Sequence, residues 1–177
     1  MSFFIKDNSF LTEENKNFIN NVVLNNDFPY YMYDHSVGED NKYFLCHVLL
    51  KRKEHRKENE TFNSHFHPGF LSIIDSFVKK HKIKIKELLR MAVNYSFNNT
   101  YEKVDSHTDH DFEHKQLLIC LNDPADKSSK TVILNNKNKI FKSISPKQYQ
   151  GICFDSASHY NYLPKFGNRI MFVCTFI

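Results

Sequence analysis

The sequence has no tryptophan, and its four cysteines are nowhere spaced as Cys-x-x-Cys. Without that spacing, the paired-cysteine motifs of redox and metal proteins are not expected. Cys120, Cys153 and Cys174 lie inside apolar runs that are typical of buried strands. Together with Cys46, they are expected to be reduced thiols of the core.

Long apolar segments are also missing. No segment approaches the roughly 18 consecutive apolar residues of a membrane-spanning helix. The N-terminus, MSFFIKDNSF, has no basic region followed by a long apolar stretch, so no secretory leader is expected. We therefore expect a soluble cytoplasmic protein. The abundance of Asn and Lys favours an AT-rich genome, viral or bacterial, and for a viral protein the host cytoplasm is the expected location.

No strong excess of one charge is present. Lys and Arg number 24 against 20 Asp and Glu, so the formal net charge is +4. The densest basic run, residues 51–57, is interrupted by Glu54 and followed by further glutamates. It is interpreted as a solvated loop rather than a nucleic-acid surface. With 177 residues, 41% of them hydrophobic, the chain 1–177 is predicted to form a single domain.

Two amphipathic helices are predicted in the first half. One begins at Thr12, a residue type that caps helices, and runs to about Asn25. The other follows Pro68 and carries an apolar stripe at helical spacing, made of Phe70, Ile73, Ile74, Phe77 and Val78. The polar residues from about 51 to 66 are interpreted as loop, and residues 31–66 as a possible source of a substrate loop.

Beyond about residue 82, short runs rich in Val, Ile, Phe and Tyr alternate with polar turns. The predicted strands are residues 88–97, 116–121, 131–134, 139–144, 151–155 and 169–177. Helices followed by strands indicate an α+β, mainly β fold of the jelly-roll type. Helical support from about residue 1 to 82 would then cover a β core from about residue 83 to 177.

The segment 105–111 concentrates two imidazoles and three carboxylates within seven residues. In an extended chain, side chains at positions i and i+2 point to the same side, about 6.6 Å apart along the backbone. His107 and Asp109 satisfy that spacing and can converge on one metal ion. The third ligand is predicted to be His159, which lies just beyond a later apolar strand.

Two histidines and one carboxylate leave coordination positions open. This set is favoured by iron(II) enzymes that bind a chelating co-substrate together with O2, although zinc enzymes use the same ligand types. Arg169 starts the last apolar run. A buried arginine there requires an anion, and the distal carboxylate of 2-oxoglutarate would supply one as a bidentate partner.

These residues carry a family resemblance. The HTD motif, the strands LLICLND and KTVIL, the segment GICFDSASHYNYLPKFGNR and the terminal strand resemble the prolyl-4-hydroxylase-like branch of the 2-oxoglutarate/iron(II) dioxygenases. The resemblance covers roughly residues 88–177. It implies a double-stranded β-helix with N-terminal supporting helices. It also implies that Tyr95, on the strand preceding the HTD motif, contacts 2-oxoglutarate.

The family implies Fe(II), 2-oxoglutarate and O2 as cofactors, with ascorbate as a reductant, and succinate and CO2 as products. Because related enzymes that lack the carboxylate ligand leave a position free for halide, Asp109 favours hydroxylation over halogenation. The substrate is not identified. The resemblance favours a prolyl or other protein side chain over nucleic acid or a small molecule, and no obligate partner is evident.

Two other functions remain open from the residues alone. One is a cupin-like metal-dependent hydrolase with the same three ligands, and the other is a non-catalytic jelly-roll binding module. Among competing ligands, His110 and Asp111 are interpreted as solvated loop residues. His65, His67 and His114 are interpreted as surface or core histidines, because lone histidines are more often structural than metal-binding.

Overall fold

The computed structural model describes residues 3–36, 42–57 and 62–177. Its helices are α1 (Glu13–Phe18), continued by a π-helical turn (Ile19–Val23), a short 3-10 turn (Lys53–His55) and α2 (His67–His81). Its strands are β1 (Phe4–Asp7), β2 (Tyr31–Tyr33), β3 (Phe44–Leu50), β4 (Leu88–Phe97), β5 (Lys115–Cys120), β6 (Thr131–Leu134), β7 (Ile140–Ile144), β8 (Gly151–Asp155), β9 (His159–Asn161) and β10 (Asn168–Phe176).

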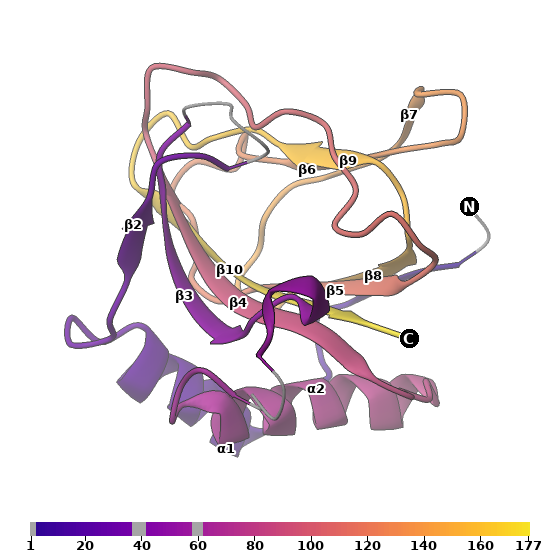
Figure 1. The fold of residues 1–177 in the computed structure, drawn as a ribbon. Coiled ribbons are helices and arrows are strands. Elements are labelled where there is room, and N and C mark those ends of the chain that lie inside the picture. Colours follow the sequence, from indigo (N-terminus) through magenta and orange to yellow (C-terminus); the bar gives the residue numbers. More distant parts are fainter. Residues whose placement is uncertain (1–2, 37–41, 58–61) are drawn as a thin grey trace.

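The strands form two antiparallel sheets that face each other (Figure 1). The larger sheet has the order β1-β8-β5-β10-β4-β3-β2, and the smaller sheet has the order β7-β6-β9. Lys103 and His107 add isolated bridges to Tyr162 and His159, so the chain after β4 runs along the free side of β9. These bridges extend the smaller sheet beyond its three strands.

The helices cover the outer face of the larger sheet (Figure 1). All five residues of the apolar stripe on α2 are buried, in one cluster with Met91, Val93, Phe172 and Phe176 from β4 and β10. Burial of each large apolar side chain contributes about 1.5–3 kcal/mol, so this layer is a major source of stability. Helix α1 begins as predicted, because the Thr12 hydroxyl accepts a hydrogen bond from the Asn15 N–H at 3.2 Å.

The inner face of the larger sheet is divided into two parts. Toward β8 and β5 it is filled by a second apolar cluster that includes Leu118, Phe154 and Val173. Toward β4 the facing side chains are polar, and a cavity remains between the sheets. The division arises from strand alternation, because Arg90, Asn94 and Ser96 on β4 point inward while their neighbours pack under the helices.

The predicted fold class is confirmed, and so are both helices and all six predicted strands. No strand end differs from its predicted position by more than one residue. The placement of helices before residue 82 and strands after it is wrong. Strands β1, β2 and β3 lie before that point and join the larger sheet. Their runs are short or interrupted by polar residues, and they are held in the sheet by pairing, β1 with β8, β3 with β4 and β2 with β3.

Two smaller expectations can also be compared with the structure. The segment 31–66 is not one loop, since it contains β2 and β3, although residues 37–41 and 58–61 lie outside the described part. All four cysteines are buried free thiols, as predicted. Among the described residues, no helix is long and apolar enough to cross a membrane.

Candidate metal and co-substrate site

The two histidines of the site are brought together by backbone pairing. The N–H of His107 donates to the carbonyl of His159 at 3.0 Å, and the reverse bond measures 2.9 Å. Their ring centroids are 4.6 Å apart. Each Nδ1 lies within 3.0 Å of a backbone carbonyl, that of Asp105 for His107 and that of Ala157 for His159. These bonds fix both rings and leave each Nε2 for a ligand.

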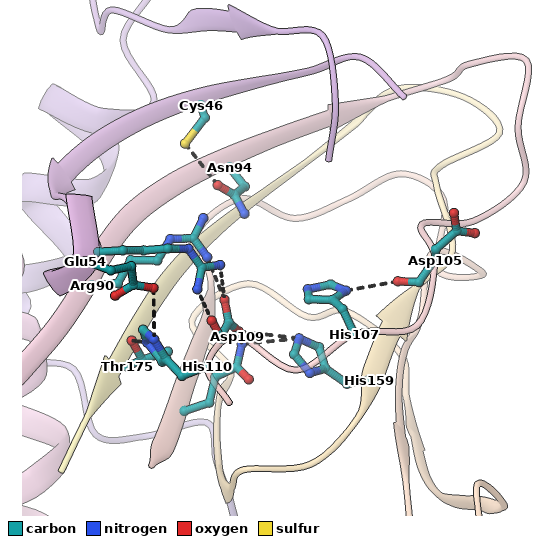
Figure 2. A network of polar contacts seen from close by, with 12 residues as sticks. Cys46, Glu54, Arg90, Asn94, Asp105, His107, Asp109, His110, His159 and Thr175 are labelled. Atoms are coloured by element: carbon teal, nitrogen blue, oxygen red, sulfur yellow. Dashed lines mark hydrogen bonds and ion pairs between the residues drawn. The ribbon is translucent and has the colours of Figure 1, made fainter. Parts of the chain in front are cut away.

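Asp109 completes the group. One ligand atom from each of His107, Asp109 and His159 lies within 4.8 Å of the others, and Figure 2 shows the three side chains pointing toward one another. The structure thus brings together the three predicted ligands. The backbone geometry differs from the extended strand that was expected to bring them together. His107 forms only an isolated bridge, and Asp109 lies in a bend.

The carboxylate of Asp109 is held from both sides. Its Oδ1 accepts hydrogen bonds from Arg90 at 2.7 Å and from Arg52 at 3.0 Å. Its Oδ2 accepts a bond from the Gln116 amide at 2.5 Å and lies 3.7 Å from Nε2 of His159. The arginines therefore occupy one carboxylate oxygen, and the other faces the two imidazoles.

The charge states suit metal binding. Burial alone would raise the pKa of Asp109, but Arg90, His159 and Arg52 outweigh it and hold that pKa well below its usual range. Burial lowers the pKa of His159 to about 4, against the smaller opposite effect of Asp109. At neutral pH the carboxylate is therefore ionised and the imidazole is neutral, which are the forms that bind a metal.

The competing ligands do not join the group. Asp111 is exposed, as predicted, but His110 is buried, so its assignment to a solvated loop is wrong. The Nε2 of His110 lies 2.9 Å from the hydroxyl of Thr175, and its Nδ1 is 3.8 Å from a carboxylate oxygen of Glu54 (Figure 2). The contact with Thr175 places this ring against β10, away from the group of three ligands. His114 is also buried, with its ring against that of His110.

Arg169 lies across the cavity from the three ligands. It lines the same cavity and is only 3% exposed. Its guanidinium donates to the hydroxyl of Thr131, while its Nε has no hydrogen-bond partner. Within the described ranges, no carboxylate forms an ion pair with it. A buried cation without a counter-ion is costly, so this geometry is suited to an anionic ligand in the cavity.

Tyr95 does not lie in this cavity. It occupies the β4 position between Asn94 and Ser96, both of which line the cavity, and alternation turns it to the helical side. There its ring contacts that of Tyr30, and its hydroxyl accepts a hydrogen bond from Asn168 at 2.8 Å. The prediction that Tyr95 contacts a co-substrate in this cavity is therefore wrong.

Four residues of the site were not predicted: Arg52, Arg90, Gln116 and Thr131. Arg90 and Gln116 had a usable signal, because each is a polar side chain at an inward position of an otherwise apolar strand. Arg52 was assigned to a solvated loop within residues 51–57, but its side chain is only 25% exposed. Interleaved glutamates made the run look solvated, and only the path of the loop brings Arg52 to Asp109.

Solved structures with the same architecture were found, although neither a protein-family model nor a curated protein sequence matches the chain. A 2OG-Fe(II) oxygenase-family oxidoreductase from Burkholderia pseudomallei superposes with a TM-score of 0.75 at 11% identity, covering 98% of this chain and 84% of that one. A prolyl-4-hydroxylase from Pseudomonas putida gives 0.66 at 11% identity, covering 98% and 91%. A prolyl hydroxylase from Trichoplax adhaerens, in complex with a peptide fragment of hypoxia inducible factor, gives 0.66 at 15%, covering 98% and 83%.

The chain has the fold of the 2-oxoglutarate/iron(II) oxygenases. This confirms the jelly roll, or double-stranded β-helix, that the sequence predicted. In the oxygenase fold of this chain, the cavity between the sheets contains the two-histidine, one-carboxylate set that suits non-haem iron(II). His107, Asp109 and His159 would hold the metal, and Arg169 with Thr131 would hold a carboxylate at the far end of the cavity.

Proposed function

We propose that this protein is a non-haem iron(II), 2-oxoglutarate-dependent dioxygenase that hydroxylates its substrate. The observation that carries the proposal is the pairing, in one cavity, of three converging ligands with a buried arginine that lacks a carboxylate partner in the described residues. Oxidation of 2-oxoglutarate by O2 at the bound iron supplies the chemistry that converts a substrate C–H to C–OH, yielding succinate and CO2.

Different residues of the cavity would bind the metal, bind the co-substrate and exclude water. His107, Asp109 and His159 would hold the metal and leave coordination positions open for the co-substrate and O2. Arg169 and Thr131 orient the co-substrate through its distal carboxylate. Leu118, Met171 and Val173 line the same cavity and limit the access of water. Ascorbate is the expected reductant that keeps the iron in its active state.

A protein or peptide is the proposed substrate, in preference to nucleic acid or a small molecule. A structural neighbour is a prolyl hydroxylase in complex with a peptide fragment, which supports this choice at the level of the fold only. We further propose that residues 1–177 act as one oxygenase domain. The cytoplasm remains the expected location, since the four cysteines are free thiols.

The proposal is tested by anaerobic titration of metal-free protein with Fe(II) and 2-oxoglutarate. A weak visible charge-transfer band is expected for the wild type. Arg169→Ala is expected to lose the band while still binding iron, and His159→Ala is expected to lose both. If the wild type binds iron but shows no band, the co-substrate assignment is wrong.

The same variants separate the two other functions. A metal-dependent hydrolase with these ligands has no need of Arg169, so Arg169→Ala would retain its activity. A binding module would produce no succinate from 2-oxoglutarate under any condition with iron. The buried guanidinium of Arg169, which has no carboxylate partner among the described residues, favours the oxygenase over both.

A further inference from the structure

A second hollow, here called the β3 groove, opens beside the metal site. Its floor is made by the inward side chains Phe44, Cys46 and Val48 of β3, with Tyr33 of β2 beside them. It shares Arg52, Arg90, His107 and Asp109 with the main cavity. A molecule in the β3 groove would thus reach the metal ligands directly, from the side opposite β5 and β8 in the strand order.

The two cavities differ in size. The β3 groove has a volume of about 620 Å³, and the cavity that Arg169 lines has about 110 Å³. The smaller one suits a compact co-substrate, and the larger one suits a more extended molecule. The groove lies against β3 and β2, the strands at one edge of the larger sheet.

Positive charge gathers where the groove meets the metal site. Arg52 and Arg90 both contact the same oxygen of Asp109, so two guanidinium groups share one carboxylate. Glu54 is the other carboxylate on the groove, and it is half exposed and 3.8 Å from His110.

Among the described residues that line the two cavities, the formal charges do not balance when the proposed cofactors are added. Iron(II) and three arginines (Arg52, Arg90 and Arg169) give five positive charges, while Asp109, Glu54 and doubly charged 2-oxoglutarate give four negative ones. Lys51, which also lines the groove, is left out of this sum because it has an interaction of its own. A substrate with an anionic group at this position would neutralise the excess charge, and in a partly buried site such a charge pair is strengthened.

The rim of the groove favours a peptide. Tyr33 lines the groove and is 38% exposed, and its ring lies beside that of Phe44 with centroids 5.5 Å apart. Exposed aromatic side chains at the edge of a polar site are typical of protein-binding surfaces. An extended peptide can cover such a rim and still present one side chain to the metal.

We propose that the β3 groove binds an extended peptide that carries an acidic side chain, and that the carboxylate of this side chain pairs with Arg52 and Arg90 beside the metal. This inference rests on the proposed function. It assigns the substrate an acidic residue near the hydroxylated position, and it makes the two arginines determinants of specificity as well as supports of Asp109.

The test compares two matched pools of unstructured ten-residue peptides, one with Asp or Glu at a fixed position and one with Asn or Gln there. Each pool is incubated with protein loaded with Fe(II) and 2-oxoglutarate, and the product is measured as peptide that gains one oxygen atom. The acidic pool is expected to give at least tenfold more product. This comparison uses the wild type alone and does not depend on any variant folding.

Variants then locate the effect. Arg52→Gln and Arg90→Gln are expected to reduce the preference for the acidic pool to less than twofold and to raise KM for acidic peptides more than KM for 2-oxoglutarate. Lys53→Gln is the matched control. It removes the same charge from the same segment, but Lys53 points to Glu87 and does not line the groove. The charge-transfer band of each variant reports separately whether iron and 2-oxoglutarate are bound.

Each outcome decides the matter. Equal product from the two pools, or a preference that persists in both arginine variants, would overturn the anion assignment. Hydroxylation of small carboxylic acids but of no peptide would overturn the peptide assignment. If the band forms and no peptide is hydroxylated, the inference is wrong and the proposed function stands. If no band forms with iron bound, the proposed function itself is wrong.

Discussion

The role proposed for each residue of this site depends on its hydrogen-bond partners. The hydroxyl of Thr131 and the guanidinium of Arg169 are both buried, and the bond between them is the only described polar contact of that guanidinium. Arg169 is thereby oriented but not neutralised. The same reasoning separates His110, whose Nε2 contacts the hydroxyl of Thr175, from His107 and His159, each of which offers one ring nitrogen to the group that includes Asp109.

Replacing Thr131 with Val is expected to weaken 2-oxoglutarate binding about 10- to 100-fold, because a hydrogen bond to a charged group contributes roughly 1.5–3 kcal/mol. Titration of the charge-transfer band measures this affinity. Thr131→Ser retains the hydroxyl and is expected to remain close to wild type. Metal affinity should not change in either variant, and an unchanged 2-oxoglutarate affinity in Thr131→Val would contradict the role assigned to Thr131.

Replacing His110 with Ala is expected to leave metal stoichiometry unchanged while lowering the free energy of unfolding by about 1–3 kcal/mol, since the buried hydroxyl of Thr175 loses its partner. Burial lowers the pKa of His110, so the ring is neutral at physiological pH and its loss removes no charge. Cobalt(II) titration and urea unfolding measure the two effects. His107→Ala, in contrast, should lose the metal.

At the scale of elements, the first strand is attached to the second helix by one carboxylate. The Oδ2 of Asp7, at the end of β1, lies 2.7 Å from Nζ of Lys80 and 2.8 Å from Nε2 of His81, both near the end of α2. Burial would raise the pKa of Asp7, but the bonds from Lys80, the Ser9 backbone and His81 outweigh it and lower that pKa.

Asp7→Asn is therefore expected to lower the free energy of unfolding at pH 7 by about 1 kcal/mol. The folded pKa of Asp7 lies below the unfolded value of 3.8. The stabilisation is thus complete above that value and declines as the pH falls below it. Urea unfolding of both proteins between pH 7 and pH 3 measures this difference. A difference that stays constant down to pH 3 would argue against the ion pairs, and the exposed Asp27→Asn serves as the control.

For the whole molecule, the site joins the two layers of the fold. His159 belongs to the smaller sheet, Arg169 to the larger one, and Asp109 is bound by Arg52 and Arg90 from the open end of the larger sheet. A metal and a co-substrate in this cavity would therefore bind only when both sheets are in place, so their binding free energy adds to the stability of the fold.

A metal ion at about 100 times its dissociation constant is expected to raise the free energy of unfolding by roughly 2.7 kcal/mol and Tm by about 5–10 °C. Manganese(II) serves as the probe in a thermal unfolding experiment, and a chelator should reverse the shift. His159→Ala is expected to show no shift at the same concentration. A shift of equal size in that variant would place the metal elsewhere.

Much of the fold and the site could be predicted from the sequence, because it follows from the spacing of apolar and ligand-type residues along the chain. The stripe from Phe70 to Val78 and the runs that form β4, β6 and β8 needed no tertiary information, since their periods of burial follow from helix and strand geometry. The unusual density of ligands at residues 105–111, with His159 and Arg169 beyond later strands, was sufficient for the centre of the site. Strands β1 to β3 could not be predicted, because their short or mixed runs are stable only when paired in the sheet.

The sequence by itself determined the two helices, the main strands, the three ligands and the buried arginine, because each depends on residue type and spacing along the chain. Only the tertiary structure decided which side of β4 holds Tyr95, that His110 is buried, and that Arg52 and Arg90 meet on Asp109. The physical reason is that these outcomes depend on which face a strand buries and where a loop returns. Both are set by contacts between residues far apart in the chain.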